Sequence, residues 1–214
     1  MRKVKLFYEN SGINTNELCI SVPSYFSNAE RQAVLDAAEI ANLKCIRLIN
    51  ESTAIALNYG FFRKSDLPEK DPRYVAFVDF GHSKLTVTIA SFLKGKMRIV
   101  AHHSDRNLGA RNMDYLLVDI LGEEFTKKVG SDPRKNVRCR LRMLDFIEKQ
   151  RKILSSNKEG TIHLESLLDD EDLHKNINRT EFEELIQPML DKVQGVLEET
   201  LLKSGKIFPN EIAG

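Results

Sequence analysis

Residues 17–41 read ELCISVPSYFSNAERQAVLDAAEIA, and this stretch decides the fold class. Its first six residues are a mostly apolar run that Pro23 should end, because proline has no N–H group to donate to a neighbouring strand. Ser27 and Glu30 then have the spacing of a capping box, in which each side chain bonds the backbone N–H of the other residue. Alanine and valine recur behind them at helical spacing. The stretch therefore predicts a buried strand followed by a helix.

A second strand and a second helix follow along the chain. Residues 45–49 are mostly apolar, and a helix should run from about Ser52 to Tyr59 and end at Gly60. Residues 63–73 are polar and contain two prolines, so they form the clearest linker in the chain. The alternation of strands and helices before this linker indicates an α/β layer.

The part after the linker consists of strands and then mostly of helices. Tight turns at 81–83 and 94–96 separate three apolar runs, which predicts an antiparallel meander. A last helix should begin with a capping box from Thr180 to Glu183 and break or bend at Pro188. The ranges expected are 74–80, 84–92 and 97–103 for the meander, 111–129 and 134–155 for two amphipathic helices, and 160–166 and 173–178 for two short strands.

The composition is that of an ordinary globular protein. The chain has 214 residues, and its 32 Lys and Arg against 31 Asp and Glu give a formal net charge of +1. Such a balance gives no reason to expect nucleic acid or a membrane as partner. No apolar run approaches the roughly 18–20 residues of a membrane span, and no signal peptide is evident. Cys19, Cys45 and Cys139 lie far apart, which favours a reducing compartment, so we expect a cytoplasmic protein.

The sharpest local signal for chemistry is the run Val78-Asp79-Phe80-Gly81-His82-Ser83. It places an aspartate at the end of a predicted strand and a glycine turn directly after it. Free backbone N–H groups in such a turn can hold an anion, and an aspartate there can hold the water shell of a magnesium ion. The alternative is an ordinary hairpin in which Asp79 caps the turn. The run alone does not decide between the two.

A second signal is a polar face on the predicted helix 134–155. Glu148, Arg151, Lys152 and Ser155 are spaced so that they share one face. A guanidinium can stack on an aromatic base, and the other groups can bond a sugar or ring edge. The alternative is a solvated face with an intrahelical Glu148–Lys152 pair.

The same helix belongs to a basic stretch, residues 134–152. Intramolecular pairing or a partner surface explains this stretch better than nucleic acid, because it lacks interleaved aromatic residues. Neither a zinc-protease motif nor a P-loop occurs in the sequence.

Several motifs taken as a series resemble the ATPase domain of the 70-kDa heat-shock chaperone superfamily. The resemblance covers about residues 14–205. It rests on VPSYF at 22–26, Arg31-Gln32, Asp36-Ala37-Ala38, Ile49-Asn50-Glu51, AIALNYG at 54–60 and Asp79-Phe80-Gly81-His82-Ser83. Ordinary members carry Gly-Gly-Gly-Thr where this chain has Gly81-His82-Ser83-Lys84. The Gly-His-Ser turn is similar to that of the large 110-kDa branch.

The resemblance implies an actin-like ATPase fold of the ribonuclease H-like class, with two lobes around a nucleotide cleft. Only part of it is expected here: a remnant of the first lobe over 1–68 and most of the second lobe over 69–214. Within the second lobe, 73–107 and 187–214 would form the sheet-bearing inner subdomain and 108–186 the outer helical cap. The first phosphate loop is expected upstream of residue 1, and a second adenosine motif just after Gly214.

The resemblance also implies roles for single residues. Glu51 matches the acid that positions the attacking water, and Asp79 matches the aspartate of the magnesium shell. The second phosphate loop corresponds to Gly81, His82, Ser83 and Lys84, a further glycine turn to Gly109, and the adenosine-contacting face to Glu148, Arg151, Lys152 and Ser155. Pro23 and Arg31 match a relay between the nucleotide and the peptide-binding half. The implied ligands are ATP or ADP with Mg²⁺.

Three positions depart from the family pattern. Ser52 replaces a proline of the relay, Lys84 a threonine near the terminal phosphate and Thr86 an aspartate of the catalytic cleft. These departures favour a co-chaperone that holds ATP and acts as nucleotide exchange factor for a 70-kDa heat-shock chaperone. The alternative is an ATP-hydrolysing chaperone domain coupled to binding of unfolded polypeptide clients through regions outside this chain. A sugar or acetate kinase on the same fold is a third hypothesis.

Overall fold

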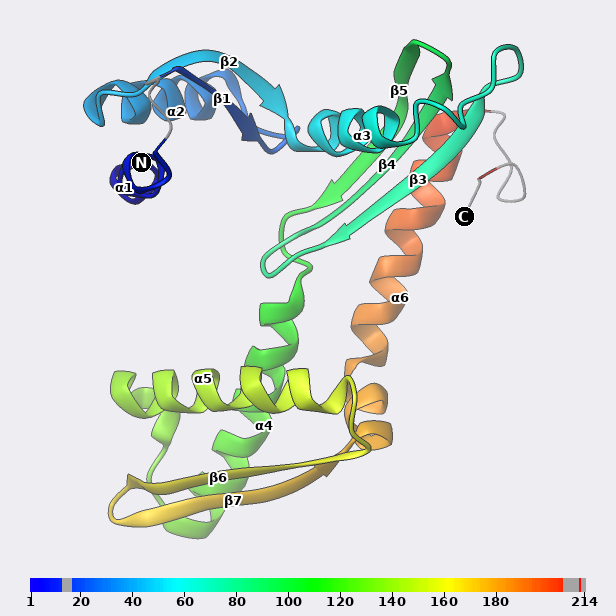
Figure 1. Cartoon of the computed structure of the whole chain (residues 1–214). Coiled ribbons are helices and arrows are strands. Elements are labelled where there is room, and N and C mark those ends of the chain that lie inside the picture. Colours follow the sequence, from blue (N-terminus) through cyan, green and yellow to red (C-terminus); the bar gives the residue numbers. More distant parts are fainter. Residues whose placement is uncertain (13–16, 206–211, 213–214) are drawn as a thin grey trace. The chain divides into compact units, whose positions relative to one another are not determined.

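The computed structural model describes residues 1–12, 17–205 and 212, and the chain divides into two compact units (Figure 1). The first unit comprises Met1–Val78, Thr86–His103 and Thr200–Gly214. The second comprises Asp79–Leu85 and Ser104–Glu199. The chain therefore passes between the units more than once. The expected outer subdomain, 108–186, falls within the second unit, but the two expected lobes remain a prediction.

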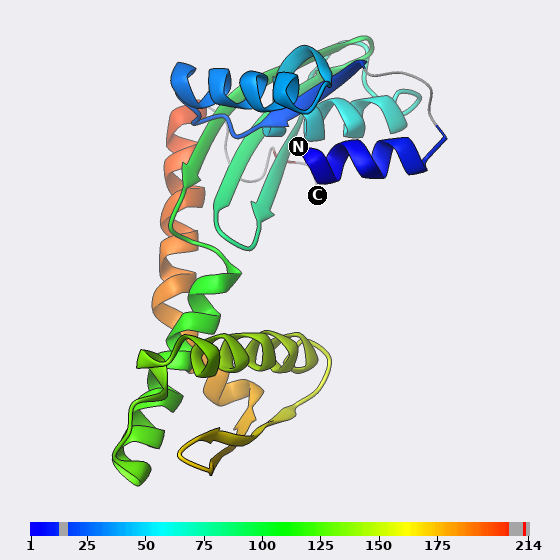
Figure 2. The same ribbon diagram turned by 90° about the vertical axis from the view of Figure 1, so that its left-hand side faces the viewer.

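The first unit begins with the predicted pair of strand and helix. Strands β1 (Glu17–Val22) and β2 (Lys44–Asn50) pair in parallel, and α2 (Asn28–Ile40) packs on them (Figure 2). The capping box of α2 is confirmed, because Ser27 N–H donates to Glu30 Oε2 over 2.7 Å and Glu30 N–H donates to Ser27 Oγ over 3.3 Å. Helix α1 (Arg2–Asn10) precedes this pair and was not predicted.

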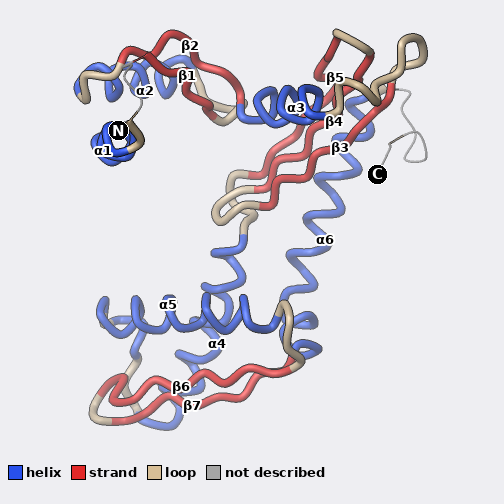
Figure 3. The backbone as a smooth tube through the Cα atoms, viewed as in Figure 1, coloured by secondary structure: helices blue, strands red, loops and turns tan. Residues whose placement is uncertain are grey.

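Helix α3 and most of the predicted meander also belong to the first unit. Strands β3 (Arg73–Phe80), β4 (Leu85–Leu93) and β5 (Lys96–Asp105) form one sheet in this order (Figure 3). Helix α3 (Glu51–Phe62) contributes Ala56 to a core with Phe92 of β4. The predicted helix end at Gly60 is wrong. A Cβ at Gly60 would lie 3.2 Å from the Phe92 ring, so the glycine serves close packing inside the helix.

The second unit is built around two helices and a hairpin. Helix α4 (Ala110–Val129), the short 3₁₀-helix η1 (Pro133–Lys135) and α5 (Val137–Leu154) precede the antiparallel strands β6 (Glu159–Leu168) and β7 (Glu171–Asn178). The first part of α6 (Arg179–Ser204) follows β7. The fully buried residues Met143, Ile147 and Ile162 lie at the centre of a core to which α4, α5, β6, β7 and α6 contribute.

Two helix starts differ from the prediction. Helix α5 begins three residues later than expected, because Asn136 Oδ1 accepts hydrogen bonds from the N–H groups of Arg138 and Cys139 and so caps it there. Helix α6 is capped by Asn178, whose Oδ1 accepts from Glu181 N–H over 2.8 Å, and not by Thr180. Of the break or bend predicted at Pro188, the break is wrong, since α6 continues through this residue. Among the described residues, no helix is long and apolar enough to cross a bilayer.

Candidate nucleotide site

The predicted phosphate turn lies between β3 and β4 and belongs to the second unit. Asp79 is half-buried near the end of β3, and Gly81 N–H donates to Lys84 O over 2.9 Å, which closes the turn. His82 and Ser83 form its tip, and within the described part of the chain their N–H groups donate no hydrogen bond. Two neighbouring N–H groups left open in a turn are the donors that an anion requires.

Gly109 packs directly against this turn. A Cβ at this position would lie 2.6 Å from His82 O and 2.7 Å from Lys84 N, so only glycine fits. Helix α4 begins immediately after it, and the N–H groups of Ala110 and Arg111 donate to Gly81 O and His82 O over 3.0 and 2.9 Å. The structure therefore brings together Gly109 and the turn 81–84, which the sequence places 25 residues or more apart.

The second predicted cluster lies on α5. Lys152 Nζ donates to Glu148 Oε1 over 2.6 Å, so the intrahelical pair that the alternative interpretation expected is present. Ser155 caps the C-terminal end of the helix, and its Oγ donates to Lys152 O over 2.6 Å. The Lys152 side chain remains 66% exposed and the Glu148 side chain 39% exposed, so both stay accessible to a ligand despite the pair.

Arg151 points to a partner that the sequence did not reveal. Its Nε and Nη2 lie 2.7 and 3.2 Å from Oδ1 and Oδ2 of Asp114 on α4, a bidentate ion pair. The Asp114 side chain is only 4% exposed. The sequence carried one signal for it: Asp114 lies on the same face as the apolar positions Leu117 and Leu121, where an unpaired charge is unexpected.

The turn and the α5 face influence each other electrostatically. The hydrogen bond and charge of Lys152 hold the pKa of the Glu148 carboxyl below its usual value, and the charges of Arg151 and His82 contribute in the same direction. His82 belongs to the turn 81–84, whereas Glu148 belongs to α5. The two predicted clusters are thus electrostatic neighbours within the second unit.

The remaining predicted residues lie in the first unit. Arg31 on α2 is a hydrogen-bonding centre: its Nη2 donates to Asn50 Oδ1 over 2.8 Å and to Pro23 O over 3.5 Å, and its Nε donates to Phe26 O over 3.0 Å. Asn50 is the N-cap residue of α3, and half-buried Glu51 follows it in the first helical turn. The predicted relay residues Pro23 and Arg31 are therefore in contact, and Arg31 is also bonded to Asn50, the residue next to Glu51.

Half of the eight basic residues in the stretch 134–152 have partners within the second unit. Arg134 pairs with Asp132, and Arg142 donates to Ser166 O and Glu165 O over 3.0 and 2.7 Å. With the pairs of Arg151 and Lys152, these contacts support the intramolecular pairing expected from the sequence.

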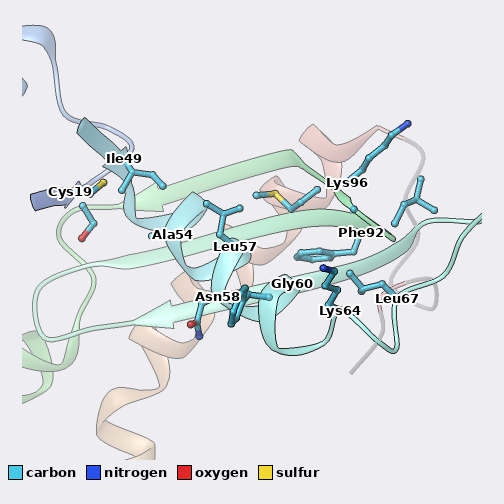
Figure 4. Close-up of a pocket in the computed structure, with 15 residues that line it drawn as sticks. Cys19, Ile49, Ala54, Leu57, Asn58, Gly60, Lys64, Leu67, Phe92 and Lys96 are labelled. Carbon is cyan, nitrogen blue, oxygen red and sulfur yellow. The ribbon is translucent and has the colours of Figure 1, made fainter. Parts of the chain in front are cut away.

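A large pocket of about 780 Å³ lies elsewhere, in the first unit (Figure 4). Its lining is mostly apolar, and it includes Leu57, Phe61 and Phe92 together with Lys64 and Lys96. It contains none of the predicted site residues. Over 1–12, 17–205 and 212, no three His, Cys, Asp or Glu side chains gather closely enough to hold a metal ion directly.

Comparisons with known proteins identify the family. The family model described as "Hsp70 protein" matches residues 2–214. The chain is 42% identical over 189 residues to "Heat shock 70 kDa protein 14" of Arabidopsis thaliana and 41% identical over 202 residues to the "97 kDa heat shock protein" of Mesocentrotus franciscanus. It is 44% identical over 191 residues to "Heat shock protein hsp88" of Neurospora crassa. These matches cover 88%, 91% and 88% of this chain, but 23%, 23% and 27% of the relatives.

The chain thus spans about a quarter of the length of the curated relatives it matches. Nucleotide binding is a general property of the ATPase domain in this family. The matches to large heat-shock proteins agree with the resemblance found in the sequence. The chain belongs to the Hsp70 family of heat-shock chaperones and carries part of its actin-like ATPase fold.

Proposed function

We propose that the second unit binds ATP or ADP with Mg²⁺. The adenosine lies on the α5 face of Glu148, Arg151, Lys152 and Ser155, and the phosphates lie on the turn 81–84. Asp79 holds the magnesium ion through its bound water. The observation that supports this most is the packing of Gly109 on the turn, since it fixes the shape of a loop whose tip has open N–H groups.

The residues present fit such a ligand chemically. The open N–H groups of His82 and Ser83 suit phosphate oxygens, and a half-buried carboxylate at Asp79 suits the water shell of a hard cation. When bound, the magnesium ion neutralises phosphate charge. The exposed ammonium of Lys152 and carboxylate of Glu148 offer one donor and one acceptor for the sugar or base.

A titration of the 214-residue chain with Mg-ATP by calorimetry tests this site. We expect weak binding, in the high micromolar range or weaker, where 1 mM corresponds to about −4 kcal/mol. Lys152→Ala should abolish the heat. Lys149→Ala is the matched control, because Lys149 is an exposed lysine of the same helix outside the proposed face. No heat with the unaltered chain, or equal loss in both variants, would refute the assignment.

At the level of the whole protein, we propose a cytoplasmic co-chaperone that acts as nucleotide exchange factor for a 70-kDa heat-shock chaperone. The departure at Lys84 supports this, because a lysine brings charge to the phosphate turn without the hydroxyl expected there. A nucleotide exchange factor of this kind has to hold ATP rather than hydrolyse it. The hydrogen bonds of Arg31 join Pro23 to Asn50, the residue next to Glu51. This arrangement fits a relay between the bound nucleotide and the peptide-binding half of the protein.

The alternative is a chaperone ATPase coupled to peptide binding, with Glu51 and Asp79 as its catalytic residues. Release of fluorescent ADP from a 70-kDa chaperone distinguishes the two. The protein that carries this chain is added with ATP or with a non-hydrolysable analogue. The exchange-factor proposal expects acceleration with both. Acceleration with ATP alone would favour the ATPase, and none with either would refute the exchange role.

A further inference from the structure

A buried carboxylate lies one helical turn beyond the start of α4. The Asp114 side chain is 4% exposed, and a charge so deeply buried is strongly unfavourable unless it is paired. Its partner is Arg151 of α5, with both carboxylate oxygens bonded to the guanidinium at 2.7 and 3.2 Å. Parallel bonds of this kind fix the plane of the guanidinium as well as its position.

The first turn of α4 also holds the phosphate turn. Ala110 and Arg111 donate to Gly81 O and His82 O, and Gly109 packs on the same loop. Asp114 follows Ala110 by four residues, which is about 6 Å along a helix. One rigid helical turn therefore contacts the phosphate turn at its beginning and Arg151 at its end. It sets the distance between the two halves of the proposed nucleotide site.

The ion pair leaves part of Arg151 available. Nε and Nη2 are bonded to Asp114, whereas Nη1 has no hydrogen bond to any residue that the structure describes. The Arg151 side chain is 16% exposed. A guanidinium held at one edge can still offer a planar face to a heteroaromatic ring.

We propose that Asp114 is a positioning residue for nucleotide recognition. It fixes the guanidinium plane of Arg151 at a set distance from the turn 81–84, so that a purine base stacks on Arg151 while the phosphates reach the turn. This inference rests on the proposed function of the same site. It adds a specific expectation: the Asp114–Arg151 pair increases the affinity for nucleotides but not the affinity for inorganic polyphosphate.

The competing explanation is that the pair only stabilises the second unit. Replacement of a buried ion pair by apolar residues of similar size is often neutral for stability, whereas removal of one partner leaves an unpaired charge. The variant for the test is therefore the double substitution Asp114→Leu with Arg151→Met. We expect it to unfold at the same urea concentration as the unaltered chain and to bind inorganic triphosphate equally well. Its affinity for Mg-ATP should fall about tenfold.

Two further variants complete the binding test. Arg151→Lys retains a charge for Asp114 but loses the planar fork, so ATP affinity should again fall while triphosphate affinity stays. Arg134→Met removes another bidentate arginine of the second unit, the partner of Asp132, and should leave ATP affinity unchanged.

A measurement without nucleotide tests the positioning itself. In the NMR spectrum, the Nε–H proton of Arg151 should exchange with water much more slowly than that of exposed Arg138. Equal exchange rates would overturn the proposal. If the unaltered chain binds ATP and the double variant binds it equally well, Asp114 has no positioning role while the proposed function stands. If the unaltered chain binds no ATP, the proposed function fails and this inference fails with it.

Discussion

Substitution of Gly109 by alanine should disrupt the phosphate turn. The new Cβ would lie 2.6 Å from His82 O and 2.7 Å from Ser83 C, whereas ordinary contact begins at 3.4 Å. All the atoms it meets belong to the backbone, so no side chain can rotate away and the turn must shift by about 0.8 Å. That shift strains the hydrogen bonds that Ala110 and Arg111 donate to the turn. Overpacking and weakened bonds together should destabilise the second unit by about 2–4 kcal/mol.

Urea unfolding followed by circular dichroism measures this loss. With a slope of about 1–3 kcal/mol per molar urea, the midpoint should fall by on the order of 1–2 M. Gly195→Ala is the control, because this glycine lies inside α6 and a Cβ there meets no atom within 4 Å. Alanine at that position should stabilise the helix by up to about 1 kcal/mol. A Gly109→Ala chain that unfolds at the unaltered midpoint would refute the close-packing argument.

Three other predictions concern the core, the thiols and the response to pH. Phe92→Ala should destabilise the first unit by about 3–5 kcal/mol in urea unfolding, because the ring is fully buried. A thiol reagent should modify exposed Cys19 at once and buried Cys139 only on unfolding, as mass spectrometry of partly labelled protein would show. The hydrogen bond from Ser166 N–H holds the pKa of the Asp172 carboxyl below its ordinary value of 3.8. Its stabilising effect is therefore present above about pH 4 and lost as the pH falls through the lowered pKa, so Asp172→Asn should weaken the acid dependence of the urea midpoint.

Local chemistry in the sequence predicts most elements of the fold. The capping box at Ser27 marks the start of α2 correctly, and the three strands of the meander begin and end within two residues of their expected positions. One error arises where a distant residue decides. Gly60 resembles a helix end, but it lies inside α3 because the Phe92 ring occupies the space beside it. Thr180 and Asn178 are both plausible caps, and the choice follows from where β7 ends.

In the candidate site too, the sequence predicts local features but not contacts with distant residues. Helical spacing alone predicts that Glu148, Arg151 and Lys152 share a face, but it cannot tell which of them have partners on other elements. Arg151 differs from its neighbour Lys152 only because Asp114, 37 residues earlier, reaches it from α4. This difference decides how the site must be tested. Arg151→Ala would leave a buried carboxylate unpaired, so a loss of ATP binding in that variant would not separate misfolding from a lost base contact. Lys152 has its partner on its own exposed face, and its substitution isolates the contact with the ligand.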